Sequence, residues 1–444
     1  MTATLTGARV LLRSRDRATA VLTLLAFALP HAVLLAVSGG VMAFYQRSQA
    51  PRNGLESEGF YLFLACFAAI LIIVPVLSMG AAAARLGMSR RARDLAVLRL
   101  LGLPPAQAKA ASVLETTVHS AIGVALGSAL YAATLPAWQA IRFQGFPMRP
   151  AEMWVGPWIL LGLGAAMLAL AAGSAWFGMR RVAITPLGVA RRSDVHRVSP
   201  AGAILAVLVV LAWLGPVQAV VGMGPAAAMG VTLAFLAVVF ALVNAVGSWL
   251  VGALGRRMAA AARSPQMMLA GRRLADDPRS VWRSFGAVAM VGFVVGVLFP
   301  VFTGTVGGAS SSDADDATLM ADIATGMLLT LGITIVLAAI STAVNQAIRV
   351  IDGVPETLSL IRTGAPTGFL DRSRRWEIGL PAVLLICGSV ALGLLFTSPL
   401  ISMGATLQPV FAVLAFAVAG VAVILAASET TRPLRARLLR EAAA

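Results

Sequence analysis

Ten apolar segments, each long enough to cross a lipid bilayer as a helix, constrain the fold of this chain more than any other feature. A membrane-spanning helix needs about 20 consecutive apolar residues. The segments are residues 18–44, 60–84, 111–135, 155–179, 200–220, 226–254, 284–306, 320–346, 378–398 and 406–427. A chain of 444 residues that is 59% hydrophobic and only 12% charged cannot cover a soluble surface. The sequence therefore predicts an all-α polytopic membrane protein with ten transmembrane helices.

The positions of the basic residues predict the orientation of these helices. Of the 35 Lys and Arg residues, 31 lie at the termini and in alternate connections, whereas 4 lie in the remaining connections. Because cytoplasmic connections are enriched in Lys and Arg, we expect both termini in the cytoplasm. The same distribution accounts for the net charge of +16 as a topology signal, so we expect no nucleic acid as a partner.

A cytoplasmic motif that occurs twice divides the chain into two related halves. Residues 93–104 read RDLAVLRLLGLP and residues 355–366 read PETLSLIRTGAP. An offset of 262 residues places Gly102 on Gly364 and Glu115 on Glu377. In each copy we expect a short amphipathic helix that Gly and then Pro terminate.

The repeat predicts three units. Residues 1–199 form the first half, with four spans and a cytoplasmic helix at about 90–103. Residues 200–254 form a central two-helix hairpin. Residues 255–444 form the second half, with four spans and a cytoplasmic helix at about 352–365. We expect the two parallel halves to pack about an axis along the membrane normal.

Several polar side chains lie within or near the ends of predicted spans. They are His31, Asn244, Asn345 and Gln346. Such groups are candidates for a substrate path, and they also form hydrogen bonds to neighbouring helices. For His31 we expect a local hydrogen bond, to a backbone carbonyl that Pro30 leaves without its helical donor. Both interpretations are open for all four residues.

Small residues recur in the third predicted span, which contains Gly123 and Gly127. A glycine on a helix face allows a neighbouring backbone to approach closely. We therefore expect this face to be a helix–helix contact rather than a chemical site.

The predicted connection at residues 303–321 is rich in Gly, Ser and Asp. This composition predicts a solvated linker. We interpret the acidic set in and just after it, Asp313, Asp315, Asp316 and Asp322, as part of this solvated linker, with contact to a cation as the alternative. The chain has no HExxH, no GxSxG, no Cys/His cluster and no phosphate-binding loop, and these are the patterns that mark such sites. We expect no catalytic residue, no metal site and no cofactor in this chain.

Residues 93–115 resemble the cytoplasmic signature of the FtsX-like/MacB-type permease family. In that family a helix of the form R-x-x-A-x-L-R-x-x-G precedes a Glu that enters the next span. Residues 185–191, TPLGVAR, are similar to the family's closing D-P-L-x-A-L-R element, and residues 269–279, LAGRRLADDPR, to its opening element. Ten spans with a central hairpin are similar to the BceB-like antimicrobial-peptide resistance permeases.

The resemblance implies the permease subunit of an ABC transporter in the plasma (inner) membrane of a bacterial cell. A separate cytoplasmic ATPase homodimer would bind ATP and Mg²⁺. The permease would couple hydrolysis to export or extraction of a hydrophobic or amphiphilic compound, such as an antimicrobial peptide or a lipid-like molecule. The alternative is a mechanotransmitting sensor or regulatory scaffold that acts on a membrane kinase or cell-wall hydrolase without transport. Membrane lipids and an extracellular or membrane sensor are the further partners implied.

The same resemblance implies which residues couple the chain to the ATPase. They are Arg93, Asp94, Leu98, Arg99, Leu101, Gly102, Glu115, Glu356, Leu360, Arg362, Gly364 and Glu377. The chain departs from the family in two respects. It has no large extracellular domain between the seventh and eighth spans, so we expect the substrate to enter laterally from the bilayer. It also has Pro355 where the first copy has Arg93, so we expect two unequal ATPase contacts.

Overall fold

The computed structural model describes residues 17–49, 58–85, 104–182, 225–306, 314–401 and 408–429. Within these ranges the chain is helical apart from irregular turns and a two-stranded hairpin. Five helices in these ranges are long and apolar enough to cross a membrane, namely Ala20–Gln49, Lys109–Ala140, Gly156–Phe177, Thr318–Ile348 and Gly368–Leu394. The prediction of an all-α membrane protein is confirmed at this level. The fifth predicted span, 200–220, lies outside the described residues.

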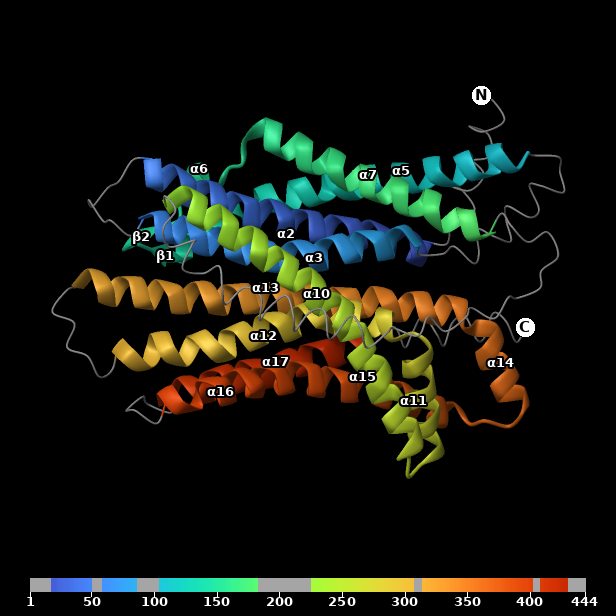
Figure 1. Cartoon of the computed structure of the whole chain (residues 1–444). Coiled ribbons are helices and arrows are strands. Elements are labelled where there is room, and N and C mark those ends of the chain that lie inside the picture. Colours follow the sequence, from blue (N-terminus) through green and yellow to red (C-terminus); the bar gives the residue numbers. More distant parts are fainter. Residues whose placement is uncertain are drawn as a thin grey trace.

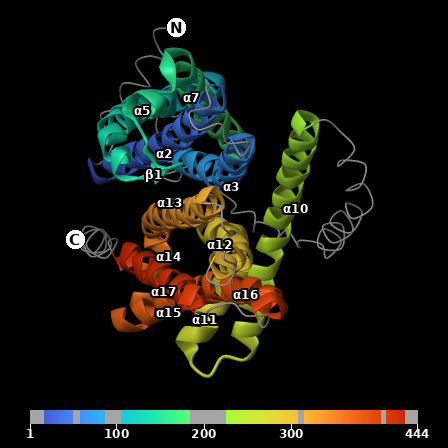
Figure 2. The same ribbon diagram turned by 90° about the vertical axis from the view of Figure 1, so that its left-hand side faces the viewer.

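The helices form two groups, which Figure 2 shows from one end. The first group contains α2 (Arg17–Gln49), α3 (Glu58–Arg85), α5 (Pro105–Thr134) and α7 (Gly156–Val182). The second contains α12 (Pro278–Val306), α13 (Ala314–Asp352), α15 (Thr367–Ala382), the π-helical turn η2 (Val383–Cys387), α16 (Gly388–Ile401) and α17 (Gln408–Glu429). The groups meet where α3 packs against α12 and α13. A further helix, α10 (Pro225–Ala260), packs mainly on α12 and on α11 (Pro265–Asp276).

The two ends of the bundle carry different structures (Figure 1). At one end α2 ends and α3 begins, beside β1 (Arg142–Phe143), β2 (Phe146–Pro147) and α6 (Pro150–Met153). We call it the hairpin end. The other end carries α11 and α14 (Val354–Arg362) and is called the α14 end. The helices of each group alternate in direction along the chain, and α15, η2 and α16 follow one another without a break as one continuous helical segment.

The connection predicted at 303–321 is largely helical, so that prediction was wrong. Helix α12 continues to Val306 and α13 begins at Ala314, which places Asp315, Asp316 and Asp322 in a helix. The intervening residues, 307–313, lie outside the described part of the chain and include Asp313. Because the two helices are separated by so few residues, there is no room here for a large additional domain.

The second copy of the cytoplasmic motif ends as its sequence predicts. Helix α14 ends at Arg362, and Gly364 has a φ of 93°, in the left-handed region that glycine adopts without a steric penalty. Pro366 then precedes α15 in an extended conformation. The first copy, at about 90–103, lies outside the described residues.

The helices that follow the two copies start at equivalent positions. Helix α5 begins at Pro105 and α15 at Thr367, which repeats the offset of 262 residues. In each case a proline with extended backbone precedes the helix. The helix bounds thus agree with the internal repeat seen in the sequence.

Glycines bring helix backbones into contact within each group. A Cβ atom on Gly127 would lie 2.5 Å from the backbone oxygen of Ala28, and one on Gly123 would lie 2.7 Å from a side-chain carbon of α2. In the second group, a Cβ atom on Gly393 would lie 2.5 Å from the backbone oxygen of Phe293. The expected packing role of Gly123 and Gly127 is confirmed.

We predict that Gly127→Ala lowers the thermal stability of the protein, although alanine favours helix by about 1 kcal/mol relative to glycine. Overpacking typically costs about 1–3 kcal/mol. Gly162→Ala is the matched control, because no described atom lies within 4 Å of the position its Cβ would take. Thermal unfolding of both variants in lipid nanodiscs measures the difference. Equal midpoints for the two variants would contradict this packing account.

Candidate functional site

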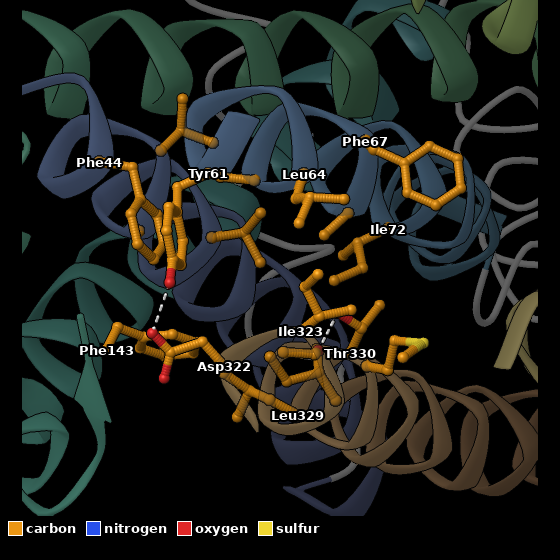
Figure 3. A pocket seen from close by; sticks show the side chains of 18 of the residues that line it. Phe44, Tyr61, Leu64, Phe67, Ile72, Phe143, Asp322, Ile323, Leu329 and Thr330 are labelled. Carbon is orange, nitrogen blue, oxygen red and sulfur yellow. Dashed lines mark hydrogen bonds between the residues drawn. The ribbon is translucent and has the colours of Figure 1, made fainter. Parts of the chain in front are cut away.

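An apolar pocket of about 160 Å³ lies between the two helix groups, and Figure 3 shows its wall from close by. Its lining comes from α2 and α3 on one side and from α12 and α13 on the other. At the hairpin end, side chains from residues 135–155 complete it. Among the described lining residues Asp322 has the only carboxylate, whereas most of the others are aliphatic or aromatic. Such a lining suits a molecule with a substantial apolar part.

The segment between α5 and α7 folds over the hairpin end as a small cap. It consists of η1 (Leu135–Ala140), the two strands and α6. The strands pair with Arg142 opposite Pro147 and Phe143 opposite Phe146. The two turn residues, Gln144 and Gly145, have φ values of 58° and 76°. Because few residues other than glycine adopt positive φ, neighbouring contacts must hold Gln144 in this conformation.

Arg47, near the end of α2, holds the cap in place. Its buried guanidinium donates to Glu152 Oε2 through Nη2 at 2.7 Å and through Nε at 3.1 Å. The remaining donors reach the backbone oxygens of Phe143 at 3.0 Å and Pro147 at 3.2 Å, and Gln144 Oε1 at 3.4 Å. A buried charge is tolerated when it is paired and hydrogen-bonded in this way. One side chain therefore joins α2, α6 and both strands.

Tyr131 of α5 attaches the other side of the cap. Its hydroxyl donates to the backbone oxygen of Met153 and accepts a hydrogen bond from the Val155 amide at 3.2 Å. Its ring stacks on Trp154 with a centroid separation of 6.2 Å. These contacts fix the connection between α6 and α7 against α5.

Asp322 of α13 joins the second helix group to the first. It is only 8% exposed, so the prediction of a solvated linker residue was wrong. Its Oδ2 accepts a hydrogen bond from the Tyr61 hydroxyl of α3 at 2.8 Å. It accepts another from the backbone N–H of Gln144 at 2.6 Å. Figure 3 shows the bond between Tyr61 and Asp322 at the pocket wall. Gln144 is the turn residue with a positive φ, so this hydrogen bond to Asp322 stabilises the conformation of the turn.

His31 lies in α2 and is fully buried. Its Nε2 lies 3.3 Å from Ser128 Oγ of α5. This hydrogen bond joins two helices, whereas we expected a bond to a backbone carbonyl near Pro30. His31 is not among the residues that line the pocket.

The three predicted amide residues are placed elsewhere. Asn345 donates to Ser284 Oγ of α12 at 2.9 Å, and Gln346 beside it is also buried. Neither lines the pocket. Asn244 belongs to α10, but its side chain lies outside what the structure describes. The substrate-path role of these residues remains a prediction.

The two glutamates of the repeat occupy the same position in their helices. Glu115 and Glu377 are each the eleventh residue of α5 and α15, and they are 2% and 4% exposed. Glu115 Oε1 lies 3.7 Å from His119 Nδ1. At the position equivalent to His119 the second copy has Pro381, just before the π-helical turn η2. The two copies therefore share the buried carboxylate but differ one helical turn later.

The remaining predicted coupling residues lie on α14 or outside the described residues. On α14, Leu360 is half-buried and Arg362 is exposed. Glu356 is the third residue of the same helix, and its side chain is not described. The first-copy residues outside the described part are Arg93, Asp94, Leu98, Arg99, Leu101 and Gly102.

Sequence reasoning missed the polar network at the hairpin end. Two local signals point to part of it. Gln144 and Gly145 stand between two phenylalanines, a pattern typical of a tight hairpin. Arg47 and Glu152, of opposite charge, stand close to the ends of predicted spans. No local signal indicates that Asp322 joins them.

Comparison of the chain with protein-family models, with curated proteins and with solved structures found no match. The sequence motifs and the geometry of the pocket are therefore the basis for assigning a function.

We predict that Arg47→Met destabilises the protein by about 3–5 kcal/mol, because it leaves the Glu152 carboxylate buried without its ion-pair partner. The matched control is Arg375→Met. Arg375 pairs with Glu429 at a similar distance, 3.2 Å, but the two side chains are 61% and 38% exposed. Its loss should cost at most about 1 kcal/mol. Denaturant unfolding in mixed micelles compares the two variants, and similar losses would argue against a structural role for the buried pair.

Proposed function

We propose that this chain is the permease subunit of an FtsX-like/MacB-type ABC transporter. It would couple ATP hydrolysis by a separate cytoplasmic ATPase dimer to export or extraction of a hydrophobic or amphiphilic compound across a bacterial plasma membrane. The observation that carries this proposal is the repeated unit of a short helix, a Gly-x-Pro turn and a long helix. Its second copy is α14, the turn at Gly364–Pro366 and α15, and its first copy is the sequence 93–115.

The position of α14 suits a docking element. This helix of nine residues packs against α13 and lies at the end of the bundle, away from the other helices (Figure 1). It carries an exposed basic residue, Arg362, close to the half-buried Leu360. A short amphipathic helix of this kind presents both an apolar anchor and a charge to a groove on a partner protein.

Helix α15 provides a route from this docking element into the membrane. It continues from Pro366 with little intervening chain, and Glu377 is buried near its middle. In this proposal a rotation of α14 moves α15, which packs against α11 and α17. The work is a conformational change of the permease, and the bond-breaking chemistry belongs to the ATPase.

The pocket between the groups supports an apolar or amphiphilic substrate. In this proposal the hairpin end is external and the α14 end is cytoplasmic. The short interval between α12 and α13 leaves no large domain there to capture a substrate, so entry from the bilayer is the route that we propose.

We predict that Leu360→Asp abolishes co-purification of an ABC ATPase, because a charge replaces the apolar anchor of α14. The tagged chain is purified from native membranes in mild detergent, and bound proteins are identified by mass spectrometry. Met268→Asp is the control. Met268 is an exposed apolar residue of α11 at the same end of the bundle, but outside the repeated motif. Leu98→Asp tests the first copy.

Recovery of no ATPase with the unsubstituted chain, or equal recovery with both variants, would overturn the permease assignment. A labelled amphiphile in proteoliposomes with the recovered ATPase then separates transport from a regulatory scaffold. A scaffold would hydrolyse ATP without moving the compound.

A further inference from the structure

The carboxylate of Asp322 is bonded to neutral donors, although it lies beside an apolar pocket. The two groups that donate to it are the Tyr61 hydroxyl and the backbone N–H of Gln144. Arg47, the cation of the adjoining network, donates instead to Glu152, to Gln144 Oε1 and to backbone oxygens. Among the described residues, no cationic group forms a hydrogen bond with Asp322.

Aromatic rings stand next to this carboxylate. Phe44 stacks on Tyr61 with a centroid separation of 5.8 Å, and Phe143 meets Phe44 edge-on at 5.4 Å. All three rings line the pocket with Asp322, and Figure 3 shows them at the same part of its wall. Aromatic faces attract cations through their quadrupoles. A carboxylate beside aromatic rings is therefore a suitable environment for an ammonium group.

We propose that the pocket binds cationic amphiphiles, with the cationic group at Asp322 and the apolar chain between the two helix groups. This inference rests on the proposed function, in which the pocket receives a hydrophobic or amphiphilic substrate. It specifies that the substrate carries a positive charge. An ammonium group donates a hydrogen bond to the carboxylate and is also attracted to it as an opposite charge, whereas a neutral donor lacks this second contribution. An anionic amphiphile of the same length would be repelled by Asp322.

Binding of this kind takes place at the contact between the helix groups. Tyr61 and Gln144 both donate to Oδ2 of Asp322. A carboxylate can accept further hydrogen bonds through its second oxygen, so an ammonium group can bond to Oδ1 while the bond between the cap and α13 remains.

The test measures ligand protection of a cysteine in the pocket. Thr330→Cys is a conservative reporter, because Thr330 lines the pocket and its hydroxyl donates to the backbone oxygen of Gly326 in its own helix. The Thr334 hydroxyl donates to the backbone oxygen of Thr330, which the substitution retains. The native cysteines, Cys66 and Cys387, are free and are replaced by alanine. The protein is placed in nanodiscs of neutral phosphatidylcholine, and its modification by N-ethylmaleimide is timed with dodecylamine or dodecanol present.

We predict that dodecylamine slows modification of the reporter about 5–10-fold more than dodecanol does, since the two share a chain length and differ in charge. Asp322→Asn should reduce the protection by dodecylamine to that by dodecanol. Asp276→Asn, which removes an exposed carboxylate of α11, should leave the difference intact.

Equal protection by the two compounds in the reporter chain, or undiminished protection by dodecylamine in Asp322→Asn, would overturn the proposal. The comparison of amine with alcohol needs no substitution at Asp322, so a folding defect in that variant does not decide the outcome. The measurement uses the chain without an ATPase. Failure of the ATPase pull-down and failure of cation recognition are therefore separate results.

Discussion

The buried guanidinium of Arg47 determines the structure of the hairpin end. An unpaired charge in an apolar interior is strongly unfavourable, so the five donors of this group must be satisfied. Glu152 neutralises the charge, and the backbone oxygens of the two strands accept further bonds. The strands are thereby held beside α2, and the turn between them is placed against α13. The hydrogen bonds of Arg47 therefore also determine the position of the Gln144 backbone N–H, which donates to Asp322.

The contacts between the two helix groups differ from the contacts between helices within each group. Within a group, glycines such as Gly127 and Gly393 bring backbones together so closely that an added Cβ would clash. Between the groups, large side chains meet around a pocket, and Asp322 bonds across the boundary at the hairpin end. Buried apolar side chains also cross this boundary, because Phe27 shares a cluster with Val344 and Ile72 shares one with Leu337. The contact between the groups therefore combines apolar packing with a polar bond at one end.

Local sequence features predicted the helices, and contacts between distant residues explain what was missed. Hydropathy and the Gly364–Pro366 pattern act over a few residues, so they indicated the helices and the end of α14. Arg47 and Glu152 are 105 residues apart, and Gln144 and Asp322 are 178 apart. Composition near Asp322 favoured a linker, because Gly, Ser and Asp cluster just before it. Burial against α3, which no local pattern encodes, determined its actual environment.

The difference between the two copies of the repeat has a mechanical consequence. Helix α5 continues without interruption from Pro105 through Glu115 to Thr134, and the cap follows directly, beginning with η1. The equivalent helix α15 contains Pro381 and passes into a π-helical turn, and such a turn locally weakens the regular helical ladder. In the proposed permease, a movement applied near Glu115 therefore reaches the cap and Asp322 through a continuous helix. A movement applied near Glu377 is partly absorbed at η2, so in the proposed permease the two halves transmit movement unequally.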